Sequence, residues 1–177
     1  MIITPIYLAL FLAEGIPHHF LWGLLVYAVG CVTDLLDGKI ARKYGLVTVF
    51  GKLADPVADK MLTTAALLAL MQLGFCNIWI VMAVLVREFT VTSLRLVASA
   101  QGVVIPANIW GKCKTVSQMV FTILIMLGCE LQYSGVLAAD FPFALVSNIL
   151  LAITAMLALV SGAIYVAQAV KVIDFKA

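Results

Sequence analysis

Four aspartates in two pairs are the densest group of acidic residues in this sequence. Asp34 and Asp37 lie three positions apart and Asp55 and Asp59 lie four apart, so each pair would share one face of a helix. Four carboxylates that converge repel one another unless cations neutralise them. Hard oxygen ligands favour Mg²⁺, Mn²⁺ or Ca²⁺ over zinc, and paired divalent ions are common where phosphoryl-type displacements occur. The spacing therefore predicts a site for two divalent cations.

The residues between the two pairs suit a phosphate-bearing ligand. Gly38 and Gly51 would let a ligand or a neighbouring helix approach the backbone closely, and Ala41 is small for the same reason. Arg42 can bind a phosphate group through two parallel hydrogen bonds. The alternative is that the acids only pair with nearby basic side chains at a solvated membrane edge, namely Lys39, Arg42, Lys52 and Lys60.

The composition indicates that membrane helices must position these residues. The chain has 177 residues, of which 64% are hydrophobic and 11% are charged, whereas a soluble domain has about 25% charged residues. We therefore expect one integral membrane domain over residues 1–177. The net charge is only +2 and the chain contains no basic run, so nothing indicates a nucleic-acid partner.

Apolar segments that approach or reach membrane length predict an all-α fold, a polytopic membrane protein with a six-helix transmembrane bundle. The segments cover residues 1–13, 20–33 with a continuation to 42, 47–73, 78–100, 107–127 and 143–170. Glycine, proline and polar residues separate them, and the last break is expected over Gly128–Asp140.

The basic residues predict the orientation of the bundle. Ten of the eleven belong to the second and fourth connections with their helix ends, or to the C-terminus, and the eleventh, Arg87, lies in the middle of segment 78–100. The positive-inside rule places these connections in the cytoplasm. We therefore expect a multi-pass protein of the cell membrane whose aspartates face the cytoplasm. An arginine at the depth of Arg87 generally faces a bundle interior or a polar cavity.

The pattern Asp34-x-x-Asp37-Gly38-x-x-Ala41-Arg42, followed after eight residues by Gly51-x-x-x-Asp55-x-x-x-Asp59, resembles the signature of the CDP-alcohol phosphatidyltransferase family at every fixed position. The resemblance implies a six-helix membrane enzyme, usually a homodimer, that binds CDP-diacylglycerol and two divalent cations at the cytoplasmic face. Such an enzyme transfers the phosphatidyl group to an alcohol and releases CMP.

The resemblance also implies roles for individual residues. Asp34, Asp37, Asp55 and Asp59 would bind the two cations, Mg²⁺ or Mn²⁺, and Asp59 would also act as the general base on the acceptor hydroxyl. The pocket for the CDP-linked lipid would contain Asp34, Gly38, Ala41, Arg42 and Gly51.

Three further stretches resemble the bacterial members of this family that use sn-glycerol 3-phosphate as the acceptor: Gly51–Lys60, Arg87–Arg95 and Gly111–Thr115. Arg87 and Arg95 would lie on one helix face, with Lys112 and Lys114 at the start of the next helix. These four residues are expected to bind the acceptor phosphate. The alternatives are that Arg87 pairs with Glu88 or a helix carbonyl, and that the lysines are anchors on the cytoplasmic side.

The sequence also permits other acceptor alcohols and one function of a different class. Inositol phosphate, phosphatidylglycerol or serine would use the same chemistry as glycerol 3-phosphate. A divalent-cation transporter would instead need acids distributed across the membrane depth, whereas these aspartates are confined to one side.

The N-terminus, the histidines and the cysteines each carry one further expectation. Family members usually have a short polar amphipathic segment before the first helix, and we expect it to be missing from this chain, which starts at Met1-Ile2-Ile3-Thr4-Pro5. His18 and His19 are expected to be interfacial or solvated rather than ligands. The cysteines are expected to pack within helices, since they lack metal-site spacing: Cys31, Cys76, Cys113 and Cys129.

Overall fold

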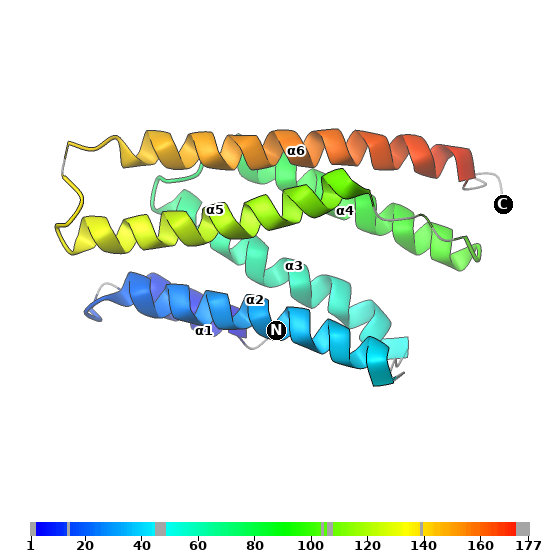
Figure 1. Ribbon diagram of the computed structural model, residues 1–177, viewed down its shortest axis with the longest axis horizontal. Helices are drawn as coiled ribbons and strands as arrows, with labels where there is room; N and C mark the ends of the chain where they lie inside the picture. The colour runs from blue at the N-terminus through cyan, green and yellow to red at the C-terminus, as the bar shows by residue number, and fades with distance from the viewer. Residues whose placement is uncertain are drawn as a thin grey trace.

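Helices are the main secondary structure of the part of the chain that the structure describes, and turns connect them. The computed structural model describes the backbone of residues 3–13, 15–44, 49–103, 105, 108–138 and 140–172, and the side chains of the same residues apart from 34–44 and 49–59. These residues form six helices and no strand (Figure 1): α1 (Ile3–Phe11), α2 (His19–Tyr44), α3 (Val49–Gln72), α4 (Ile78–Ala100), α5 (Ile109–Tyr133) and α6 (Phe143–Val172). The predicted all-α fold with six helices is confirmed.

Glycines in the left-handed conformation end three of the helices. Gly74, Gly102 and Gly135 have φ values of +81°, +70° and +72° and follow α3, α4 and α5. The amide of the next residue then bonds to a carbonyl in the last helical turn, as Phe75 N–H does to the Leu70 oxygen at 2.8 Å. This is the Schellman arrangement, in which glycine avoids the steric penalty of a positive φ.

The expected break over Gly128–Asp140 begins too early, because α5 continues through Gly128 to Tyr133. Gly128 is buried, and a Cβ atom at this position would collide with the ring of Phe143 at the start of α6. Gly128 therefore allows α5 and α6 to approach closely. It does not end the helix, and composition alone cannot separate these two uses of glycine.

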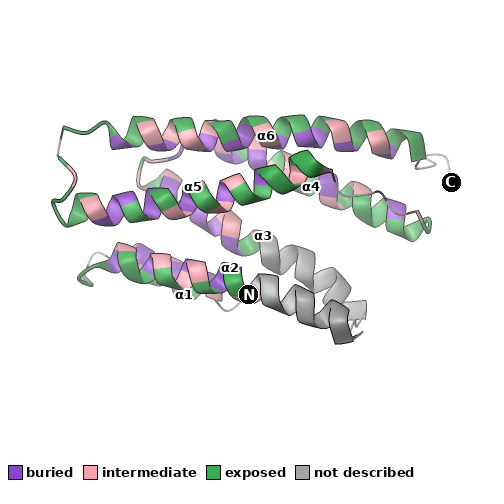
Figure 2. Ribbon diagram, in the orientation of Figure 1, coloured by how far each residue is buried: buried purple, intermediate pink, exposed green. Residues whose placement is uncertain are grey.

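Packing among the helices places α6 against α4 and α5, whereas α1 packs against α2 and α3, and α2 also contacts α5 (Figure 1). The largest fully buried apolar side chains come from five of the six helices: Tyr7, Phe11, Tyr27, Leu67, Leu70, Ile125, Met126 and Leu151. Much of the outward face of the described helices is exposed (Figure 2), and many of its side chains are large and apolar. An apolar outer surface of this extent marks a contact with lipid or protein.

Two of the described helices, α5 and α6, are long and apolar enough to cross a membrane. His19–Thr33 and Lys60–Gln72 are apolar but shorter. Helix α4 carries three charged residues, Arg87, Glu88 and Arg95, which lower its apolar character. The expectation of six helices is therefore confirmed, whereas the expectation of six membrane spans is not confirmed, since among the described helices these two alone have the length and apolar composition of a span.

The α1–α2 connection is fixed to the end of α5 by Glu130. One carboxylate oxygen of Glu130 lies 2.5 Å from Nδ1 of His18, and the other accepts a hydrogen bond from the Leu21 amide at 3.2 Å. Leu21 lies in the first turn of α2, where a negative charge is favourable, and its amide is shared between Glu130 and the His18 carbonyl, which lies 3.0 Å away. Glu130 thus caps α2 from another helix.

The structure agrees with a solvated position for His18 but not for His19. His18 is exposed, whereas His19 is only 6% exposed and donates a hydrogen bond through Nδ1 to the Phe11 carbonyl at 2.8 Å. The ring of Tyr133 also packs edge-on against His19, with centroids 5.4 Å apart. His19 is therefore part of the packing between the N-terminal helices and α5.

Replacing Glu130 with Gln is expected to lower the free energy of unfolding by about 1–3 kcal/mol, because a buried charge-assisted cap becomes a neutral one. Thermal unfolding of the detergent-solubilised protein measures this. Asp140→Asn is the matched control, because Asp140 is an exposed carboxylate in the neighbouring α5–α6 connection. Equal loss of stability in both variants would contradict the cap.

Candidate active site

The predicted metal and CDP-lipid residues belong to two helices, but their side chains lie outside the described residues. Asp34, Asp37, Gly38, Ala41 and Arg42 fall within the bounds of α2, and Gly51, Asp55 and Asp59 fall within those of α3. The helical backbone agrees with the premise that each aspartate pair shares one helix face. The convergence of the two pairs remains a prediction.

The donor chemistry of the aspartates fits divalent cations such as Mg²⁺ and Mn²⁺, because four carboxylates supply hard oxygen atoms and negative charge. Among the residues whose side chains are described, no group of three or more His, Cys, Asp and Glu could hold a metal ion. Cation binding by the four aspartates remains a prediction.

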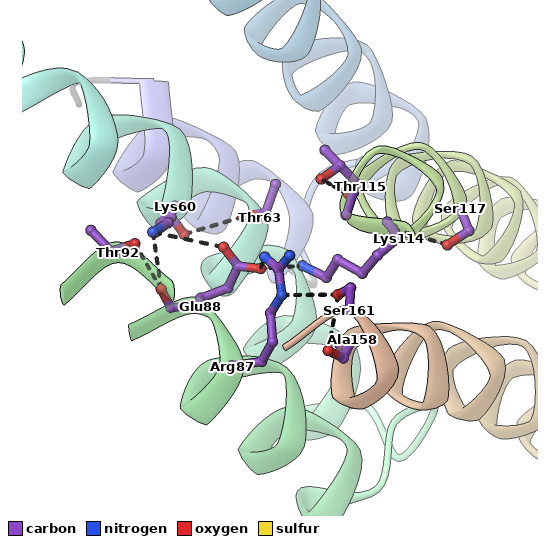
Figure 3. Close-up of polar contacts among 11 residues, drawn as sticks. Lys60, Thr63, Arg87, Glu88, Thr92, Lys114, Thr115, Ser117, Ala158 and Ser161 are labelled. Carbon is purple, nitrogen blue, oxygen red and sulfur yellow. Dashed lines mark hydrogen bonds and ion pairs between the residues drawn. The ribbon is translucent and has the colours of Figure 1, made fainter. Parts of the chain in front are cut away.

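A half-buried carboxylate at the junction of four helices is the centre of the described part of the site (Figure 3). Oε1 of Glu88 in α4 accepts hydrogen bonds from Nη1 of Arg87 at 2.9 Å and from Nζ of Lys114 in α5 at 2.6 Å. Oε2 lies 3.7 Å from Nζ of Lys60 in α3. With Ser161 of α6, which accepts from Arg87, these residues form what we call the Glu88 cluster.

The basic members of the Glu88 cluster are held away from solvent. The side chains of Lys114, Arg87 and Lys60 are 4%, 10% and 23% exposed, and that of Glu88 is 17% exposed. Charges at this depth are stable only when they are paired and hydrogen-bonded. Glu88 supplies that pairing to side chains from three helices, which makes it the central contact among them.

Arg87 lies in a slot between two glycines. A Cβ atom at Gly162 of α6 would lie 2.9 Å from Cγ of Arg87, and one at Gly111 of α5 would lie 3.1 Å from Nη2. Nε of Arg87 donates to Oγ of Ser161 at 3.2 Å, and Ser161 in turn donates to the Ala158 carbonyl at 3.0 Å. The missing side chains at both glycines thus make room for the arginine and fix its direction.

The Glu88 cluster adjoins the aspartate segment along α3. Lys60 directly follows Asp59 in the sequence, so their Cα atoms are about 3.8 Å apart. The Nζ atom of Lys60 also donates to the backbone carbonyl of Glu88 at 3.2 Å, which joins α3 to α4 at this level. A basic group of side chains therefore begins one residue after the predicted general base.

The structure brings together two of the four predicted acceptor-phosphate residues. Arg87 and Lys114 meet at Glu88, so the alternative in which Arg87 pairs with Glu88 describes the observed contact. Arg95 is exposed, with its guanidinium 5.9 Å from the centre of the Tyr165 ring, and Lys112 is exposed at the start of α5. Among the described residues, neither forms an ion pair with Glu88, whose partners are Lys60, Arg87 and Lys114, and their roles remain predictions.

Sequence reasoning did not assign a role in the site to Lys60, Glu88 or Ser161. Glu88 had a usable signal, since an acidic residue in the middle of an apolar helix is expensive and usually functional. Lys60 was assigned only to the alternative in which basic residues neutralise the aspartates. Ser161 had no signal, because a serine hydroxyl in an apolar helix commonly bonds to its own helix backbone.

Comparison with known proteins adds an independent line of support. The family model for CDP-alcohol phosphatidyltransferase matches residues 1–173. A CDP-diacylglycerol–glycerol-3-phosphate 3-phosphatidyltransferase of Bacillus subtilis (strain 168) is 42% identical over 134 residues, which cover 76% of this chain and 64% of that protein. The match thus spans just under two thirds of the Bacillus relative.

Two further relatives align over a larger share of their length. A probable phosphatidylglycerophosphate synthase of Mycobacterium tuberculosis (strain ATCC 25618 / H37Rv) is 37% identical, over 97% of this chain and 78% of that protein. A CDP-diacylglycerol–glycerol-3-phosphate 3-phosphatidyltransferase of Rickettsia felis is 34% identical, over 93% of this chain and 87% of that protein. The resemblance found in the sequence is confirmed, and the chain belongs to the CDP-alcohol phosphatidyltransferase family.

Proposed function

We propose that this chain transfers the phosphatidyl group of CDP-diacylglycerol to sn-glycerol 3-phosphate, a step of phospholipid biosynthesis that releases CMP. The observation that carries the choice of acceptor is the basic group of Lys60, Arg87 and Lys114, which begins at the residue after Asp59. A phosphomonoester brings about −1.5 to −2 charges at pH 7, which such a group attracts. Serine has no phosphate to place there. The names of the relatives agree with this acceptor.

In the proposed reaction, Asp59 accepts the proton of the acceptor's C1 hydroxyl. The oxygen then attacks the β-phosphorus, which bears diacylglycerol, and the bond from this phosphorus to the oxygen of CMP breaks. Arg87 and Lys114 orient the acceptor by binding its phosphate at the other end of the molecule. Fixing the acceptor in this way converts a bimolecular step into an effectively unimolecular one.

Asp34, Asp37, Asp55 and Asp59 would hold two divalent cations, Mg²⁺ or Mn²⁺. When bound, the cations supply charge neutralisation for the pyrophosphate of the substrate and for the leaving CMP. Gly38, Ala41, Arg42 and Gly51 would line the pocket for the CDP-linked lipid. These assignments rest on the family signature and on the oxygen chemistry of the aspartates.

We also propose that the chain is a single multi-pass domain of the cell membrane, with the active site facing the cytoplasm and a homodimer as the assembly. The apolar character of α5 and α6 and the large exposed apolar side chains support contact with the bilayer. The distribution of basic residues supports the orientation.

An acceptor panel tests the proposed function. The purified protein is supplied with CDP-diacylglycerol and, in separate reactions, with glycerol 3-phosphate, inositol phosphate, phosphatidylglycerol or serine, and CMP is measured. We expect CMP release with glycerol 3-phosphate to exceed release with the other acceptors. EDTA should abolish it, and added Mg²⁺ or Mn²⁺ should restore it. Faster release with another acceptor, or full activity in EDTA, would refute the corresponding part of the proposal.

Replacing Gly162 with Ala is expected to raise the KM for glycerol 3-phosphate about tenfold, because the new methyl group would displace the stem of Arg87. The KM for CDP-diacylglycerol should change less, since Arg87 is not assigned to the lipid pocket. Gly15→Ala is the control, because a Cβ atom at Gly15 meets nothing within 4 Å. An unchanged KM for glycerol 3-phosphate in a folded Gly162→Ala variant would contradict the claim that the space at Gly162 positions Arg87 for the acceptor.

A further inference from the structure

We propose that Glu88 is the resident counter-anion of the acceptor-phosphate subsite, a positioning residue that holds the basic side chains in place and shares them with the incoming phosphate. This inference rests on the proposed function, because it takes the Glu88 cluster as the place where the acceptor phosphate binds. Glu88 itself does not touch the reacting atoms in this account. Its role is to set the position and the available charge of Arg87 and Lys114.

The shared oxygen of Glu88 is the first observation. Arg87 in α4 and Lys114 in α5 both donate to Oε1, at 2.9 and 2.6 Å. Two cations that approach the same atom at 10% and 4% exposure would repel strongly if the negative charge between them were absent. Glu88 therefore permits α4 and α5 to bring two basic side chains together before any ligand arrives.

The second observation is that one nitrogen of the Arg87 guanidinium is still available to donate hydrogen bonds. Its Nη1 donates to Glu88 and its Nε donates to Ser161, whereas Nη2 has no hydrogen-bond acceptor among the described residues. Nη2 lies beside Gly111, since a Cβ atom added there would be only 3.1 Å away. A guanidinium has donors along two edges, so Arg87 can keep Glu88 and still bind a phosphate oxygen through Nη2.

The closeness of the Glu88 carboxylate to the proposed phosphate position affects how tightly the phosphate binds. A phosphate at Nη2 would lie close to the carboxylate of Glu88, and like charges at short range oppose each other. Glu88 therefore weakens the binding of the phosphate while it prepares the site for it. Removing only the charge of Glu88 should produce a protein that is less stable without phosphate and that binds phosphate more tightly.

The experiment compares thermal unfolding of the wild-type protein, Glu88→Gln and Glu88→Asp in detergent, first without phosphate and then with increasing inorganic phosphate. We expect Glu88→Gln to unfold at a lower temperature without phosphate. Phosphate should then raise its melting temperature more than it raises that of the wild type, with a half-maximal concentration at least about tenfold lower. Glu130→Gln removes a buried carboxylate at the far end of α5, and its response to phosphate should equal that of the wild type.

Kinetics provide the second measurement. Glu88→Gln should lower the KM for glycerol 3-phosphate and also lower kcat, because the acceptor is held more tightly but less well placed, whereas Glu88→Asp should recover much of kcat. A raised KM in Glu88→Gln, or a phosphate response equal to that of the wild type, would overturn the counter-anion role. If Glu88→Gln does not fold, Glu88→Asp still tests it, since a retracted carboxylate should strengthen the phosphate response, and an unchanged response would overturn it.

The two proposals fail separately. The phosphate titration requires neither CDP-diacylglycerol nor turnover, so it reports on Glu88 even if the wild type releases no CMP with glycerol 3-phosphate. Absence of CMP release by the wild type with glycerol 3-phosphate would refute the proposed function. Normal turnover with the wrong phosphate response in the Glu88 variants would refute the counter-anion alone.

Discussion

An Asp59→Asn variant is expected to release CMP about 10²–10⁴-fold more slowly than the wild type, because an amide cannot take the proton of the acceptor hydroxyl. Binding of CDP-diacylglycerol should largely survive, since three of the four aspartates remain. The measurement is single-turnover CMP release together with equilibrium binding of the CDP-lipid. It should be repeated at raised Mg²⁺ so that weakened cation binding is separated from loss of the base.

Asp140→Asn is the matched control for Asp59→Asn, since it makes the same chemical change at an exposed position in the α5–α6 connection. Its CMP release should equal that of the wild type. Turnover by Asp59→Asn at the wild-type rate would show that another group takes the proton. Recovery of the full rate at high Mg²⁺ would show that Asp59 acts only as a metal ligand.

The second large effect is expected for Arg87→Ala, which should raise the KM for glycerol 3-phosphate about 30-fold or more. The charge pair that is lost is the one between Arg87 and the acceptor phosphate. Truncating one partner of a buried charge pair costs about 2–5 kcal/mol of binding free energy. The KM for CDP-diacylglycerol should change little. Arg87→Lys keeps the charge but loses the guanidinium fork, so it should recover only part of the affinity.

Arg95→Ala separates the structural account from the sequence pattern. The sequence places Arg87 and Arg95 on one helix face with equal weight. In the structure Arg87 contacts Glu88, whereas Arg95 is exposed beside Tyr165. We therefore expect a smaller rise in acceptor KM for Arg95→Ala than for Arg87→Ala, and the reverse order would contradict an acceptor subsite centred on the Glu88 cluster.

The number of helices could be predicted because each one combines an apolar run with strong end signals. Gly74 and Gly102 end α3 and α4 as expected, since they take the left-handed conformation that closes a helix. Gly128 misled the prediction because it packs against Phe143, which depends on a residue from another helix. Local sequence therefore predicts helix ends well only where the reason for the glycine is local.

The candidate site also contains one part that local sequence predicts and one part that depends on contacts between helices. The aspartate pairs are recognisable from spacing alone, because both members of each pair lie on one helix and helical geometry fixes their relation. The Glu88 cluster joins side chains from α3, α4, α5 and α6. Such a set depends on how the helices pack. Arg87 and Lys114 could be proposed from charge and resemblance. Glu88 could be named only as an alternative partner of Arg87, because its contacts with Lys60 and Lys114 depend on helix packing.

The most direct test of the central claim follows labelled glycerol 3-phosphate into lipid. The purified protein is incubated with CDP-diacylglycerol, Mg²⁺ and the labelled acceptor, and both CMP and label in the lipid extract are measured. The account predicts one labelled lipid molecule per CMP released, with neither product formed in EDTA. CMP release without label in the lipid, or label in the lipid without CMP, would contradict transfer of the phosphatidyl group to glycerol 3-phosphate.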